Sequence, residues 1–199
     1  MTAALLPFLS FAVVASATPG PNNIMVLSSA ATHGLRRTIP LVLGIALGFG
    51  FMVAVIGTGL AGPITHHPLL HQVLRWVGAA WMLLLAWKIA RAGGTLAAGN
   101  GRTVPLGFWG ACAMQWVNPK AWIMAVATTA TYTVPGGDLH VQILLLAGLF
   151  VLVSLPSAGS WALLGLGTGR FLTRPARLRR FNLAMGLLLA ASVVPAVLE

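Results

Sequence analysis

The sequence predicts an all-α integral membrane protein of six transmembrane helices, arranged as two inverted three-helix repeats with both termini outside. Of its 199 residues, 58% are hydrophobic and only 7% are charged, whereas a soluble globular domain carries about 25% charged residues. Six apolar segments each approach the roughly 20 residues needed to cross a hydrocarbon core. We expect a single membrane domain over residues 1–199, with repeat halves of about 1–100 and 101–199.

The six segments are interpreted as helices because their continuous apolar runs lack the period-two alternation of barrel strands. The first segment begins with the apolar run 5–14, and the small residues after it resemble a signal-peptidase site. A signal peptide also needs a basic leading region, and no side chain before His33 is basic. We therefore expect this segment to remain in the mature protein. The expected spans are about 5–30, 39–60, 69–90, 105–131, 141–165 and 181–198.

The distribution of basic residues predicts the orientation. Ten of the twelve Lys and Arg residues fall in the first, third and fifth connections, and both acidic residues, Asp138 and Glu199, fall on the opposite side. Because cytoplasmic connections collect Lys and Arg, the odd connections should be cytoplasmic. The ten are Arg36, Arg37, Lys88, Arg91, Arg102, Arg170, Arg174, Arg177, Arg179 and Arg180.

The net charge of +10 does not indicate nucleic-acid binding, since loop charge of this kind is typical of membrane proteins. The single cysteine, Cys112, excludes an intrachain disulfide and a two-cysteine redox or metal site. We interpret Cys112 as a small packing residue. The sequence predicts no metal and no cofactor.

Helix two contains a GxxxG pattern, formed by Gly44 and Gly48. Small residues at this spacing let another helix approach closely. The pattern is compatible with packing inside one chain and also with a homodimer, and packing inside one chain is the commoner use.

The first helix should be interrupted at residues 18–23, which read Thr-Pro-Gly-Pro-Asn-Asn. Each proline removes a backbone donor and clashes with the preceding turn. In hydrocarbon, such a break persists only where it is buried in protein or lines a polar cavity. Pro21 is well placed to begin a second half-helix, because proline suits the first helical turn.

The fourth helix has a matching interruption at residues 115–122, which read Gln-Trp-Val-Asn-Pro-Lys-Ala-Trp. Pro19 and Pro119 lie 100 residues apart, so each occupies the same place in its half. Each half has three spans, and the second half is therefore inverted relative to the first. Broken helices at matching positions of inverted repeats indicate a transporter with a binding site near the midplane.

The two breaks supply the chemistry of the expected site. The N-terminus of a half-helix favours an anionic group such as a carboxylate, and a lysine near the midplane should face the bundle interior with a partner. Each feature alone also has a structural explanation, since prolines kink helices and asparagines join them. The expected substrate-binding residues are Pro19, Gly20, Pro21, Asn22, Asn23, Gln115, Asn118, Pro119 and Lys120.

At these residues the chain resembles the LysE/RhtB family of bacterial amino-acid exporters over essentially its whole length. The breaks at 18–23 and 118–122 carry the resemblance, with support from 44–48 and 75–81, and residues 28–34 are similar to the cysteine/O-acetylserine exporter branch. The resemblance implies efflux of amino acids or close derivatives across the bacterial inner membrane, driven by the proton gradient. The implied partners are a small amino-acid substrate and the lipid bilayer.

The chain departs from the family pattern at Phe49, Trp81 and residues 131–137, so the branch and the substrate are left open. Proton coupling usually needs a titratable group inside the bundle. Both carboxylates are expected outside the membrane. Of the histidines, His33 is expected at the inner face, and four are expected at the outer face: His66, His67, His71 and His140. Our hypothesis is that Lys120, or the amine of the substrate, carries the proton-linked change of charge.

Other functional classes are less consistent with the sequence. It contains no HExxH motif, no pair of membrane carboxylates and no Ser/His pair in the helices, so an intramembrane enzyme lacks candidate machinery. A channel for small polar solutes could also use a polar midplane site. A purely structural membrane protein would leave the two breaks unexplained.

Overall fold

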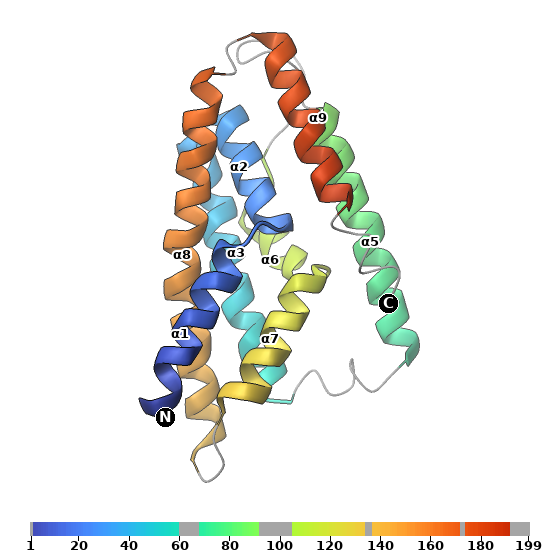
Figure 1. Ribbon diagram of the computed structural model, residues 1–199. Coiled ribbons are helices and arrows are strands. Elements are labelled where there is room, and N and C mark those ends of the chain that lie inside the picture. The colour runs from blue at the N-terminus through green and yellow to red at the C-terminus, as the bar shows by residue number, and fades with distance from the viewer. Residues whose placement is uncertain (1, 60–67, 92–104, 134–136, 172–173, 192–199) are drawn as a thin grey trace.

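The computed structural model describes residues 2–59, 68–91, 105–133, 137–171 and 174–191, and all regular structure in these ranges is helical (Figure 1). Two predicted spans are divided and four are single helices, in the order expected. The helices are α1 (Thr2–Ala17), α2 (Pro21–His33), α3 (Leu35–Gly57), α5 (Pro68–Arg91), α6 (Phe108–Gln115), α7 (Pro119–Tyr132), α8 (Leu139–Phe171) and α9 (Pro175–Ala191).

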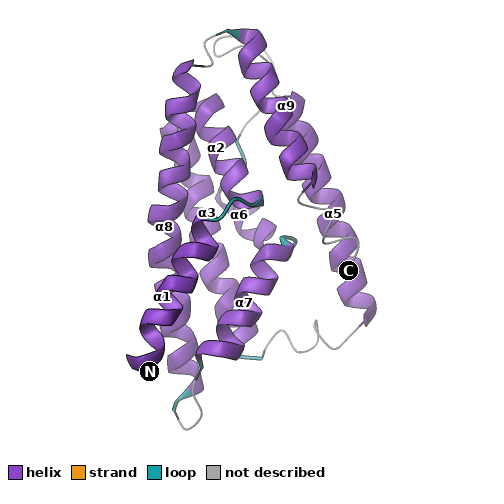
Figure 2. Cartoon of the chain, viewed as in Figure 1, coloured by secondary structure: helices purple, strands orange, loops and turns teal. Residues whose placement is uncertain are grey.

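Both predicted interruptions are confirmed. The first span separates into α1 and α2, and Pro21 is the first residue of α2. The fourth span separates into α6 and α7, and Pro119 is the first residue of α7. Figure 2 shows the first non-helical segment in the middle of the molecule, between the facing ends of α1 and α2.

The long helices α3 and α8 pack against each other and carry the divided helices. Helix α3 contacts α6 and α7, and α8 contacts α1 and α2. Helices α5 and α9 pack on each other and lean away from the others in Figure 1, and α9 also contacts α2. One apolar cluster joins α2, α3, α5, α6, α8 and α9. A second is built around the aromatic rings of Phe8, Phe49 and Phe150.

Many large apolar side chains on the outside of the helices are exposed. Leu6, Leu144 and Leu152 are 74%, 62% and 65% exposed, and they lie on three different turns of α1 and α8. So many exposed large apolar side chains are unfavourable in water, whereas hydrocarbon solvates them. The surface therefore agrees with the membrane class predicted from composition.

The GxxxG glycines of α3 pack inside the chain, as the commoner interpretation expected. A Cβ on Gly48 would lie 2.6 Å from the Cα of Cys112, and a Cβ on Gly44 would collide with the backbone of Phe108. Both contacts are to α6. Cys112 is half-buried, and its thiol donates a hydrogen bond to Gly44 O at 3.3 Å.

Three groups of basic residues that we assigned to connections lie on helices, which corrects that part of the prediction. Arg36 and Arg37 are in the first turn of α3, and Lys88 is in the last turn of α5. The cluster Arg177–Arg180 lies within α9, which begins at Pro175 rather than near residue 181. The reason is that hydropathy marks where a helix enters the hydrocarbon, whereas helices continue into the headgroup region. Arg102 and Glu199 lie outside the described residues.

Among the described residues, two helices are long and apolar enough to cross a membrane by length and composition. They are α3 over its full length and α8 over residues 139–169, and Leu5–Ala17 is a shorter apolar helix. The breaks explain why the first and fourth spans do not qualify, since each of their halves is too short alone. The six-span inverted topology therefore stays a prediction.

Candidate functional site

The break between α1 and α2 leaves backbone carbonyls that the side chains of Asn23 and Trp161 satisfy. The chain is fully extended at Gly20, with φ −175° and ψ 179°. The Asn23 side chain donates to Ser16 O at 2.8 Å and to Thr18 O at 2.9 Å. The Trp161 indole of α8 donates to Ala17 O at 3.3 Å. A break inside a membrane helix persists because partners of this kind replace the missing helical bonds.

The break between α6 and α7 is stabilised in a similar manner. The Asn118 side chain caps α7 by accepting from Lys120 N at 3.1 Å, the usual role of asparagine at a helix start. The Trp122 indole donates to Trp116 O at 2.8 Å. Asn118 is buried, with 2% of its surface exposed, so this cap lies inside the protein.

The two breaks, 93 or more residues apart in sequence, contact each other. The amides of Asn22 and Gln115 exchange two hydrogen bonds, of 2.9 and 3.3 Å. The Lys120 ammonium donates to Thr18 O at 2.8 Å, and the stem of the same lysine packs on Gly20. The expected partner of Lys120 is therefore a backbone carbonyl of the opposite break.

A pocket of about 50 Å³ lies between the breaks, against α3 and α8. Its lining includes Lys120 and the first residues of α2, and no carboxylate is among its described residues. The hydroxyls of Ser16 and Ser157 are buried in this lining without a hydrogen-bond partner. Unsatisfied buried hydroxyls are costly, which indicates that a polar ligand or water completes them.

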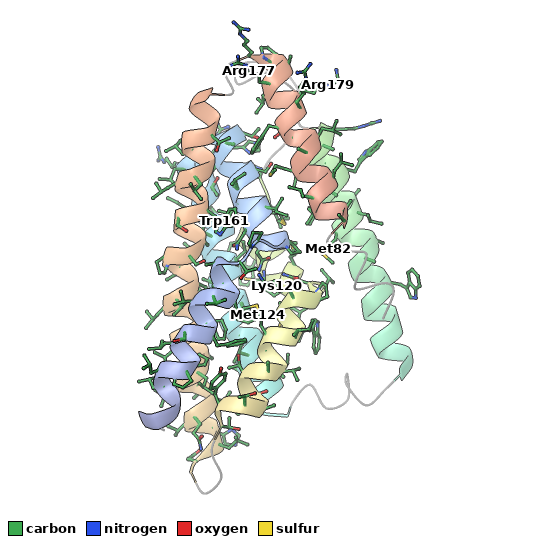
Figure 3. The ribbon with its side chains drawn as sticks, viewed as in Figure 1. Met82, Lys120, Met124, Trp161, Arg177 and Arg179 are labelled. Carbon is green, nitrogen blue, oxygen red and sulfur yellow. The ribbon has the colours of Figure 1, made fainter. Side chains whose placement is uncertain are left out.

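The pocket has the electrostatics to hold an anionic group. Helix α2 begins at its wall with Pro21, and α7 begins beside it with Pro119. Helix N-termini carry partial positive charge, and Lys120 adds a cation (Figure 3). A volume of about 50 Å³ admits only a few water molecules. An amino acid would therefore need the helices around the pocket to separate.

Most of the predicted site residues meet at this pocket. Gln115 does not line the pocket but hydrogen-bonds to Asn22, which does. Pro19 and Pro119 belong to the breaks and also do not line the pocket. Phe49, at which the chain departs from the family pattern, also lines it. The predicted residues in the lining are Gly20, Pro21, Asn22, Asn23, Asn118 and Lys120.

Sequence reasoning missed the contribution of serines from α1 and α8. Ser16, Ser154 and Ser157 line the pocket. A signal was present, because Ser154 and Ser157 flank Pro156 inside an otherwise apolar helix. This signal is weak, because the fifth span lacks the asparagine and the second proline or lysine that mark the two breaks.

Comparison with known proteins identifies the family. A model of the LysE type translocator family matches residues 13–193. Proteins named cysteine/O-acetylserine efflux protein are similar over most of the chain. The Salmonella typhimurium protein is 35% identical over 83% of this chain and 84% of its own. The Klebsiella pneumoniae protein is 32% identical over 79% and 80%. An Escherichia coli protein is 31% identical over 98% of both. No solved structure matches.

Proposed function

This chain belongs to the LysE type translocator family, and we propose that it exports cysteine, O-acetylserine or a similarly small neutral amino acid across the bacterial membrane through the pocket at the helix breaks. The family consists of membrane transporters, which agrees with the absence of recognisable catalytic motifs in the sequence. The proposed substrate class rests on the names of the relatives, and the proposed site rests on the pocket at the helix breaks.

The observation that best supports the site is the contact of the Lys120 ammonium with the opposite break. A carboxylate is a stronger partner for an ammonium than a backbone carbonyl, so a bound amino acid would draw Lys120 away from Thr18 O. The two bare hydroxyls, Ser16 and Ser157, could then bond to the substrate. Substrate binding would loosen the connection between the two breaks, which is what a transport cycle requires.

The six-span, inverted arrangement with both termini outside is part of the proposal. The contacts of the two halves correspond, since α3 packs on α6 and α7 as α8 packs on α1 and α2. Helices α5 and α9, each last in its half, pack on each other. This correspondence supports two related halves. It also supports a binding site at their interface.

We propose that export uses the proton gradient and that Lys120 or the substrate amine carries the associated charge. Among the residues that the structure describes, Lys120 is the only Lys, Arg, His, Asp or Glu in the lining of the pocket. If Lys120→Ala exports substrate with an unchanged dependence on the pH gradient, Lys120 does not carry the proton-linked charge. The substrate amine is then the remaining candidate.

The deciding experiment is export from loaded bacterial cells that lack their own exporters. Wild type, Asn118→Ala and Lys120→Ala are compared at matched membrane abundance, across amino acids that include cysteine and O-acetylserine. Ser10→Ala serves as the control, since Ser10 is an exposed residue of α1 that bonds only its own helix. We expect saturable efflux that both site variants abolish and the control keeps.

Two other outcomes have distinct meanings. If wild type exports and both site variants match it, the exporter assignment stands and the site is wrong. If a well-expressed wild type exports nothing in the panel, the substrate class is wrong. Flux that does not saturate and ignores ion gradients would identify a channel.

A further inference from the structure

A second and larger cavity opens near the opposite end of α2 from the breaks. Its volume is about 510 Å³, and α2, α5, the start of α3 and residues 105–106 line it. This is the size of cavity that small ligands occupy in proteins. It shares no lining residue with the pocket at the breaks.

The cavity is polar and positive at its rim and apolar at its floor. Lys88 and Arg91 line it from the last turn of α5, and Thr32, whose hydroxyl donates to Asn182 Oδ1 at 3.5 Å, lines it from α2. Met25 and Leu85, which are almost fully buried, form part of the floor. The part of the lining that the structure describes contains no Asp or Glu, so it provides no carboxylate partner for these cations.

Lys88 and Arg91 differ in how far they are engaged. The Arg91 guanidinium lies over the Trp87 ring, 3.9 Å from its centroid, which holds it at the rim by a cation–π contact. Lys88 is exposed, and the one acidic residue of the described chain, Asp138, caps the start of α8 through His140 N and Val141 N. Lys88 is therefore placed to take its counter-charge from a ligand.

One face of α2 connects this cavity with the breaks. Residues three or four positions apart share a helix face, so Asn22, Met25, Ser29 and Thr32 form a single row. The last three line the large cavity, and Asn22 forms the amide pair with Gln115. Buried Met82 and Met114 pack in the same apolar cluster as Met25, and Figure 3 shows where Met82 lies on α5. Methionines are flexible enough to rearrange.

We propose that this cavity is a second binding site for the exported amino acid, a cytoplasmic vestibule in which Lys88 holds the carboxylate before the substrate passes along α2 to the breaks. The inference rests on the proposed function for the identity of the ligand. The basic ends of α3, α5 and α9 would place the mouth of the cavity in the cytoplasm. The Asn22–Gln115 pair would then separate the vestibule from the pocket.

The test measures occupancy without relying on transport. Cys112→Ser removes the single cysteine, and the serine can still donate to Gly44 O as the thiol does. Thr32→Cys and, separately, Ile89→Cys then place one reporter thiol on each wall of the cavity. Purified protein in phosphatidylcholine vesicles is labelled with a maleimide, with increasing O-acetylserine, which has no thiol of its own. Two reporters keep the test valid if one variant does not fold.

We expect O-acetylserine to slow labelling at both reporters and not at Arg36→Cys, an exposed position outside the cavity. Lys88→Gln should raise the half-protecting concentration about tenfold or more, as expected for one lost charge-assisted hydrogen bond. Arg37→Gln is the matched control, because it removes the same charge at the same end without touching the cavity.

The outcomes separate the vestibule from the proposed function. If neither reporter is protected although the same protein exports O-acetylserine, the vestibule is wrong and the function stands. Protection that Lys88→Gln weakens, in a protein that exports nothing, keeps the binding site and removes the function. Protection by added phosphatidylglycerol and none by O-acetylserine would overturn the proposal in favour of a lipid site.

Discussion

Lys120 is the lysine expected near the midplane of the membrane, where a charged side chain is costly. A lysine at the centre of a membrane helix is unfavourable by at least about 2.5–3.5 kcal/mol, and a hydrogen bond to a charged group returns roughly 1.5–3 kcal/mol. The bond to Thr18 O therefore offsets much of this cost without providing a counter-charge. A residue kept in such a balance is well suited to exchange its carbonyl partner for a substrate carboxylate.

Ser157 gives a prediction at the scale of one residue. Its hydroxyl is buried without a partner, so Ser157→Ala should leave the free energy of unfolding unchanged or raise it by up to about 1–3 kcal/mol. If substrate bonds to this hydroxyl, the same change should raise the half-saturating substrate concentration for export several-fold. Denaturant titration of the purified protein and export kinetics measure the two effects.

A residue in α8 with no such role provides the control for Ser157. Ser160 is exposed, and its hydroxyl bonds within its own helix, so Ser160→Ala should leave both quantities near wild type. A loss of stability in Ser157→Ala with unchanged kinetics would contradict the binding role and make the serine a packing residue.

At the scale of elements, the contact of α3 with α6 depends on glycines, which have no side chain to separate the two helices. Because a Cβ on Gly48 would lie 2.6 Å from the Cα of Cys112, Gly48→Ala must displace one helix. Overpacking of this kind costs typically about 1–3 kcal/mol. Gly148→Ala is the matched control, since nothing lies within 4 Å of its added Cβ and alanine is favoured in helices by up to about 1 kcal/mol.

The free energy of unfolding in detergent should therefore fall for Gly48→Ala and rise for Gly148→Ala. Light scattering should report the same oligomeric state for both variants as for wild type. Dissociation of a wild-type dimer by Gly48→Ala alone would instead assign the GxxxG face to a contact between copies.

The elements also explain which boundaries the sequence could predict. The break positions follow from local chemistry, because two prolines flank Gly20 and the capping residue Asn118 precedes Pro119. A proline without such neighbours, Pro156, stays inside α8. The C-terminal end of α8 and the start of α9 could not be predicted from hydropathy, because a helix with arginines at its end continues beyond the hydrocarbon. Hydropathy indicates which residues lie in hydrocarbon, whereas backbone hydrogen bonding determines where a helix ends.

At the scale of the whole molecule, the predicted orientation is open to direct test. A green fluorescent protein fused after Glu199 should stay dark, and alkaline phosphatase fused there should be active, because the C-terminus is expected outside. Fusions in the connection at 92–104 should give the reverse pattern. A fluorescent C-terminal fusion would contradict either the count of six spans or the inversion of the halves.

The sequence by itself determined the membrane class, the order of the spans, the two interruptions and the distribution of charge, since each follows from composition or from neighbouring residues. Only the tertiary structure decided that Asn22 pairs with Gln115, that Lys120 reaches Thr18 O, and that Ser16 and Ser157 are left bare in the pocket. These contacts join residues 93 to 102 positions apart or the surfaces of different helices. No local pattern encodes them, because they depend on how the two halves pack together.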